Sequence, residues 1–147
     1  MSQATSEKSG TSTIAIDARG PRFAAAITVV VLSIALATNS IWVLGFQALV
    51  FAIGALRGPQ FTPYAMIFRK LVRPLLKGEA PVEDVRPPQF AQTVGLIFAL
   101  VGIAGLAISA PILFSIATGA ALAAAFLNAV FNYCLGCEVY LLLLRLR

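Results

Sequence analysis

The stretch FAAAITVVVLSIALATNSIWVLGFQALVFAIGAL, residues 23–56, decides the fold of this chain. It contains two uncharged apolar runs, residues 23–38 and 41–56, on either side of a short polar turn at Asn39 and Ser40. Each run is near the lower length limit for crossing a bilayer, which takes about 20 helical residues. Trp42 stands at the start of the second run, where an interfacial aromatic residue is expected. Because the turn is tight, the pattern predicts a helical hairpin in a membrane.

The composition of the whole chain supports this prediction. Of its 147 residues, 59% are hydrophobic and only 12% are charged, and the mean hydropathy is +0.89. A soluble domain of this length cannot bury so much apolar surface, so we expect an integral protein of the cell membrane. The chain has no histidine, which excludes histidine-based acid–base catalysis, His-ligated zinc and Ser-His-Asp chemistry. The net charge of +5 is explained by membrane topology and anionic headgroups, and nucleic acid is not expected as a partner.

The remaining segments complete an all-α prediction with four membrane spans. A second pair of apolar runs, residues 90–109 and 112–131, is interrupted at Pro111. Residues 62–77 alternate apolar and basic side chains at helical spacing and predict an amphipathic helix in the interface, with Thr62 as its cap. Residues 1–16 are rich in Ser and Thr and predict a disordered tail without a signal peptide. Lysine and arginine avoid both hairpin turns, so the positive-inside rule places both termini of this multi-pass chain in the cytoplasm.

The two halves of the chain resemble one another. PRFAAAITVVVLSIAL from Pro21 aligns with PQFAQTVGLIFALVGI from Pro88, at an offset of about 67 residues, and both share Pro-x-Phe-Ala before an apolar helix. Each hairpin is followed by a tyrosine and an arginine five residues later: Tyr64 and Arg69, then Tyr140 and Arg145. We therefore predict one membrane domain, residues 17–147, made of repeats at 17–77 and 87–147. Each repeat is a hairpin followed by an interfacial helix, and the two are related by an axis along the membrane normal.

Both cysteines lie together after the fourth apolar run, as Cys134 and Cys137 in a C-x-x-C motif. Positions three apart share a helix face, which brings the sulfurs within bonding reach. If a helix begins at the motif, its amides favour a thiolate at Cys134, which would attack while Cys137 resolves. Gly136 permits the close approach of another backbone. Any disulfide at a reducing cytoplasmic face is expected to be transient. One alternative is that the cysteines only pack against neighbouring helices. The other is metal binding, which needs thiolates from a second chain because two cysteines are too few for a metal site.

Other residues near the motif are supporting candidates. Glu138 can accept protons from the dithiol or be a solvated charge, and Arg145 can anchor the helix at headgroups or pair with Glu138. Asn128 and Asn132 can hydrogen-bond a neighbouring helix or line a polar pocket leading to the thiols. Tyr140 belongs to the same motif. Alanines at four-residue spacing, Ala117 to Ala129, predict close packing of the last two spans.

Four segments carry a resemblance to a known family: DARGPRFAAAITVVVLSIAL, GALRGPQFTPYAMIFRKLVRP, RPPQFAQTVGLIFALVG and AAAFLNAVFNYCLGCEVYLLLLR. Together they resemble the actinobacterial-type membrane family called domain of unknown function 4395, from about Ile16 onward. C-L-G-C-E-x-Y, Cys134 to Tyr140, is the most specific part. The resemblance implies a small four-span membrane protein, and it implies no function, since none is established for the family.

Three functions follow from these patterns. The first is a cytoplasm-facing thiol–disulfide or sulfur-relay protein, with a thioredoxin-like protein or a sulfurtransferase as partner. The second is a non-enzymatic assembly or scaffold subunit of a membrane complex. The third is metal or small-solute transport, which lacks a charged residue at the centre of any span. The residues do not decide whether the chain is an enzyme, and they identify no cofactor. The lipid bilayer and a further copy of the chain complete the expected partners.

Overall fold

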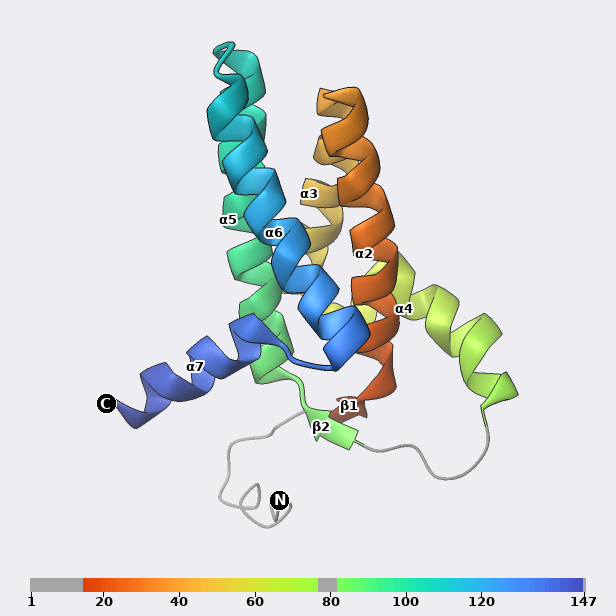
Figure 1. The fold of residues 1–147 in the computed structure, drawn as a ribbon. Coiled ribbons are helices and arrows are strands. Elements are labelled where there is room, and N and C mark those ends of the chain that lie inside the picture. Colours follow the sequence, from red (N-terminus) through yellow and green to blue (C-terminus); the bar gives the residue numbers. More distant parts are fainter. Residues whose placement is uncertain (1–14, 77–81, 147) are drawn as a thin grey trace.

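The computed structural model describes residues 15–76 and 82–146, and in these parts of the chain it is almost entirely helical (Figure 1). Four long helices lie side by side: α2 (Arg19–Thr38), α3 (Ile41–Leu56), α5 (Arg86–Ala107) and α6 (Pro111–Phe131). A fifth helix, α7 (Leu135–Arg145), leaves the end of this bundle. The prediction of an all-helical chain is confirmed.

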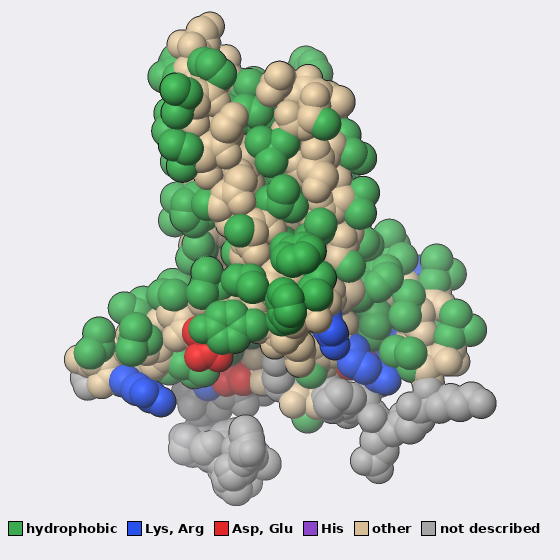
Figure 2. Space-filling model, in the orientation of Figure 1, with side chains coloured by type: hydrophobic (Ala, Val, Ile, Leu, Met, Phe, Trp, Pro, Cys, Tyr) green, Lys and Arg blue, Asp and Glu red, His purple; other side chains and the backbone are tan. Residues whose placement is uncertain are grey.

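The long helices differ in length. α2, α5 and α6 have 20, 22 and 21 residues and are apolar enough to cross a membrane, judged by length and composition. α3 contains no charged residue but has only 16 residues. Large hydrophobic side chains are exposed along the bundle, whereas Lys, Arg, Asp and Glu on the face shown in Figure 2 are confined to the end that carries α7.

The tight turns form where the sequence predicts them, for identifiable local reasons. Asn39 ends α2 in the left-handed conformation, with a φ of 51°, which asparagine tolerates better than most residues. The Ser40 hydroxyl then accepts a hydrogen bond from the Val43 amide at 3.3 Å and caps α3. Pro111 begins α6, where a missing amide hydrogen costs nothing.

Helices of one half pack against helices of the other. α3 contacts α5, and α2 contacts α6, in addition to the contact within each hairpin. Leu32, Leu44, Phe51 and Phe114 form the centre of the core between them.

Two side chains near the charged end of the bundle satisfy helix carbonyls of the opposite half. Arg22, on α2, donates to the backbone oxygens of Ala129 and Val130 at the end of α6, at 3.0 and 3.2 Å. Gln89, on α5, donates to the Ala55 carbonyl at the end of α3, at 2.8 Å. The last carbonyls of a helix have no intrahelical partner. Each half of the chain therefore supplies hydrogen-bond donors that the helix ends of the other half lack.

The central segment is helical without a break over residues 63–75, close to the helix predicted over residues 62–77. Its hydrogen-bond pattern changes along the way: after the 3₁₀ turn η2 (Pro59–Phe61), α4 (Pro63–Ile67) continues directly into the π-helical η3 (Phe68–Val72) and the 3₁₀-helical η4 (Arg73–Leu75). The predicted cap is confirmed, since the Thr62 hydroxyl accepts from the Ala65 amide at 3.2 Å. Pro74 lies in the last of these turns, where it has no amide hydrogen to continue the α-helical pattern.

Two short strands join the beginnings of the two halves. β1 (Ala15–Asp17) pairs antiparallel with β2 (Val82–Asp84), with Ile16 opposite Glu83. The predicted disordered tail, residues 1–16, lies mostly outside the described residues, but its last two residues belong to β1 rather than to coil. Three-residue strands have no periodicity that a sequence pattern could reveal, so this pairing was not predicted.

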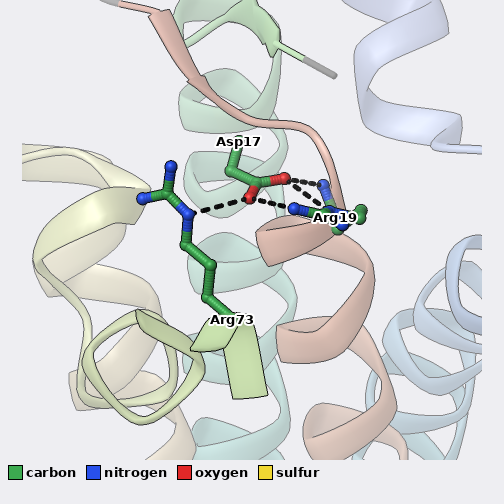
Figure 3. Close-up of polar contacts among 3 residues, drawn as sticks. All are labelled: Asp17, Arg19 and Arg73. Atoms are coloured by element: carbon green, nitrogen blue, oxygen red, sulfur yellow. Dashed lines mark hydrogen bonds and ion pairs between the residues drawn. The ribbon is translucent and has the colours of Figure 1, made fainter. Parts of the chain in front are cut away.

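An ion cluster fixes β1 to the bundle (Figure 3). Asp17 accepts three hydrogen bonds from Arg19, from its backbone amide at 2.9 Å and from Nε and Nη2 at 3.1 and 3.0 Å. Arg73, from η4, approaches the same carboxylate with Nε at 3.6 Å. The side-chain hydrogen bonds from Arg19 lower the pKa of Asp17, although partial burial opposes them. Asp84 and Arg86 repeat the arrangement after β2, with Nη2 at 2.6 Å from the carboxylate.

Candidate thiol site and its cavity

The C-x-x-C motif lies where the chain turns from α6 into α7. Asn132 ends α6 with a φ of 55°, and the following Tyr133 amide donates to the Leu127 carbonyl at 3.2 Å. Cys134 is extended, with a φ of −87° and a ψ of 103°, and α7 begins at Leu135. Asn132 thus forms a left-handed helix cap, a role that its position after an apolar run could have indicated.

The two cysteine side chains are bonded to one another, with their Cα atoms 5.1 Å apart. Cys134 is also the N-cap of α7, because its Sγ accepts a hydrogen bond from the Cys137 amide at 3.1 Å. The Cys134 carbonyl accepts from the Glu138 amide at 3.0 Å and starts the helical pattern. The helix therefore begins at the motif, as the sequence hypothesis requires. One amide of its first turn, that of Cys137, donates to the Cys134 sulfur.

Close packing against α5 holds α7 in place. A Cβ atom added to Gly136 would lie 2.6 Å from the Ala91 Cβ and 2.8 Å from its Cα, so only glycine permits this approach. Tyr140 packs against Phe90 with ring centroids 5.5 Å apart. Tyr140 therefore positions α7 on α5.

A cavity of about 420 Å³ adjoins the motif. Its wall is uncharged and consists mainly of small apolar residues from α2, α5 and α6, with Cys134 and Gly136 at the start of α7. The polar members of this wall are Thr28, Gln92 and Asn128. Asn128 and Cys134 thus belong to the wall of one cavity, whereas Asn132 does not. The wall is mainly apolar and differs in this from the polar pocket that the sequence alternative describes. No side-chain hydrogen bond joins Asn128 to another helix within the described residues.

A second cavity, of about 240 Å³, shares Pro21, Ala24 and Gln92 with the first. Its wall includes Arg69 and Arg73 and is therefore charged. The side-chain oxygen of Gln92 is buried and has no hydrogen-bond partner within the described parts of the chain. Sequence reasoning did not single out Gln92, because one glutamine near the start of an apolar helix is an ordinary interfacial residue.

A buried polar chain crosses the bundle beside the first cavity. The Tyr64 hydroxyl donates to Gln47 Oε1 at 2.7 Å, Gln47 Nε2 donates to Thr28 Oγ1 at 3.5 Å, and that hydroxyl donates to the Ala24 carbonyl at 2.9 Å. Gln47 is fully buried, and burial raises the pKa of Tyr64 to about 12. The sequence could have indicated this buried polar group, because Gln47 is the single amide side chain in the run 41–56.

The two charged candidates lie away from this arrangement. Glu138 and Arg145 are both exposed, and no ion pair between them occurs among the described residues. Arg145 stands in the last turn of α7, where a cation complements the helix dipole. In the same described ranges, no group of three or more His, Cys, Asp or Glu side chains is arranged to hold a metal ion.

Long apolar helices, charges gathered at one end and a cysteine pair at that end define a class of small helical proteins whose helices suit a membrane. The family model "Domain of unknown function (DUF4395)" matches residues 16–145. The chain therefore belongs to this family, as the four quoted segments predicted. No curated protein matches the chain, and no solved structure matches it either.

Proposed function

We propose that this chain is a multi-pass membrane protein that performs thiol–disulfide exchange through Cys134 and Cys137. One observation carries the proposal: the two sulfurs are bonded at the first turn of a helix, and Cys134 forms part of the wall of a cavity. Cysteines that only pack do not need this bond, the cap or the neighbouring space.

The exchange needs a partner with its own cysteine pair, and a thioredoxin-like protein has the required chemistry. The Cys134 thiolate attacks one sulfur of the partner's disulfide, forms a mixed disulfide and releases the partner's other sulfur as a thiolate. Cys137, as a thiolate, then attacks the Cys134 sulfur, closes the internal disulfide and releases the second partner thiolate. Two electrons pass to the partner, and the reverse sequence returns them. Sulfur relay uses the same residues: Cys134 takes the terminal sulfur of a sulfurtransferase persulfide and releases that protein's thiolate.

Four spans, with α3 as the shortest, form the membrane part of this proposal. The support is that α3 is uncharged and packs along α5, which is long enough to cross. The uncharged turns after α2 and α5 lie at the end of the bundle opposite to β1, β2 and α7 (Figure 1). The positive-inside rule places the charged end, both termini and the cysteines at the cytoplasmic face of the cell membrane.

The two-repeat architecture is also a proposal, and three pairs of features support it. Asp17 and Arg19 have the same hydrogen bonds as Asp84 and Arg86, at the offset of about 67 residues that relates the halves. β1 pairs with β2 so that the equivalent residues at the strand centres face each other. The contact of α2 with α6 has its counterpart in that of α5 with α3.

The experiment is a thiol titration of purified protein in lipid nanodiscs. After equilibration with glutathione buffers of graded potential, an alkylating reagent of known mass should add twice to reduced protein and not to oxidised protein. Cys134→Ser is the sharpest variant, because serine keeps a side-chain cap for α7 while it removes the thiol. Cys137→Ser should trap the mixed disulfide with a thioredoxin-like partner.

Two results would refute the proposal. If the cysteines never interconvert between dithiol and disulfide over the accessible potentials, exchange is excluded. If Cys134→Ser fully restores growth of a deletion strain under oxidative and sulfur stress, neither exchange nor relay is the function. Recovery of stoichiometric partners with that variant would then identify an assembly subunit.

A further inference from the structure

We infer that the 420 Å³ cavity binds the ring of a lipid-soluble quinone, which takes electrons from the Cys134–Cys137 dithiol. The inference rests on the proposed exchange function and names a second redox partner for the same cysteines. In the reaction the two S–H bonds break and the S–S bond forms. The two electrons and two protons convert both quinone carbonyls into hydroxyl groups, so the product is a hydroquinone.

The cavity has the chemistry of a site for a mostly apolar ring. Its volume of about 420 Å³ lies within the range of small-molecule sites, about 300–1,000 Å³. No charged side chain lines it, and small residues on α6, such as Ala120 and Ala124, leave room for a flat group. It lies among helices suited to a membrane, so a ligand dissolved in lipid is concentrated around it.

Asn128 distinguishes a quinone from a lipid acyl chain as the occupant. Its side chain belongs to the cavity wall, and no side-chain hydrogen bond joins it to another helix within the described residues. The amide N–H can donate to a quinone carbonyl, and the amide oxygen can accept from a hydroquinone O–H. An acyl chain offers neither group.

The cysteine pair lies where an electron exchange requires it. Cys134 and Gly136 belong to the same cavity wall as Asn128, so a ring in the cavity adjoins the disulfide. A dithiol at a reducing face becomes oxidised only if an acceptor takes its electrons. A quinone in the same membrane is such an acceptor. The thioredoxin-like partner then returns the pair to the dithiol state by supplying two electrons.

The test uses reduced full-length protein in nanodiscs and decylubiquinone, whose fully substituted ring cannot be alkylated by thiols. We expect one quinone to be reduced for each cysteine pair, followed by its absorbance, while the alkylatable thiols fall from two to none. Asn128→Leu should raise the quinone concentration for half-maximal rate about five- to tenfold, because one hydrogen bond is lost.

A matched pair of variants locates the site. Ala124→Phe fills the cavity from α6 and should abolish quinone reduction, whereas Ala123→Phe places the same ring on the exposed side of α6 and should not affect it. An unchanged melting temperature verifies that each variant has folded, and disulfide formation by glutathione disulfide verifies that its cysteine pair is intact.

The outcomes separate this inference from the proposed function. If glutathione disulfide closes the disulfide but decylubiquinone does not, the quinone inference is wrong and exchange stands. If neither oxidant closes it, exchange itself is wrong. Recovery of a phospholipid that only Ala124→Phe displaces, without quinone reduction, would overturn the inference in favour of a lipid site. Equal quinone reduction by Ala124→Phe and Ala123→Phe would place the reaction elsewhere.

Discussion

The packing of α7 on α5 at Gly136 gives a prediction with a calculable size. In Gly136→Ala, the new Cβ would lie 2.6 Å from the Ala91 Cβ and 2.8 Å from its Cα, whereas ordinary contacts begin at 3.4 Å. α7 must therefore move by about 1 Å, and such overpacking typically costs about 1–3 kcal/mol. Alanine returns up to about 1 kcal/mol of helix propensity, so we expect net destabilisation by about 1 kcal/mol.

Gly119→Ala is the matched control, because Gly119 also lies in a helix but has nothing within 4 Å of an added Cβ. It should gain the propensity without the clash, which separates the two variants by about 2 kcal/mol. Thermal unfolding in detergent measures the difference. The rate at which dithiothreitol reduces the disulfide should also rise in Gly136→Ala alone, because the displaced helix exposes the cysteines.

A compensating change tests the contact itself. Ala91→Gly removes the nearest atom, so the double variant should recover part of the lost stability and not all of it, because the Ala91 Cα remains 2.8 Å away. The reasoning is refuted if Gly136→Ala and Gly119→Ala have the same stability and the same rate of disulfide reduction.

Two further predictions concern the polar groups around the bundle. Tyr64→Phe leaves the buried Gln47 oxygen without its donor and should cost about 1–3 kcal/mol in thermal unfolding; Tyr133→Phe, on an exposed tyrosine, should cost little, and an equal loss would contradict the buried chain. The pKa of Asp17 is lowered in the folded protein by hydrogen bonds from Arg19, so its stabilising contribution is complete above the ordinary carboxyl value, about pH 4, and is lost as the pH falls below it. Asp17→Asn should therefore weaken the pH dependence of the melting temperature below about pH 4, and an unchanged profile would show that this carboxylate does not matter.

The sequence predicted the parts of the fold that depend on long periodic patterns. Apolar runs and their turns located the long helices, and the C-x-x-C spacing indicated the bonded cysteines at a helix start. It did not predict that α5 begins at Arg86 rather than near Phe90, because Pro87 and Pro88 look like a linker but also suit a first helical turn.

Tertiary features were beyond the sequence patterns for a physical reason. The cavity exists because small side chains on three helices meet, and no single helix reveals that meeting. Asn128 and Asn132 looked equivalent in the sequence, yet backbone geometry makes one a part of the cavity wall and the other a left-handed cap. The pairing of β1 with β2 joins residues far apart in the chain, and each strand contributes only three residues to it.

The carbonyl contacts of Arg22 and Gln89 bear on how the protein is made. A ribosome synthesises α2 and α3 before α5 and α6. The carbonyl at the end of α3 therefore has no donor until Gln89 is made, and Arg22 has no acceptor until the end of α6 is made. β1 likewise has no partner strand until residue 82 has been synthesised. The first hairpin cannot complete its hydrogen bonds during its own insertion, and the last step of assembly comes only when α6 has left the ribosome.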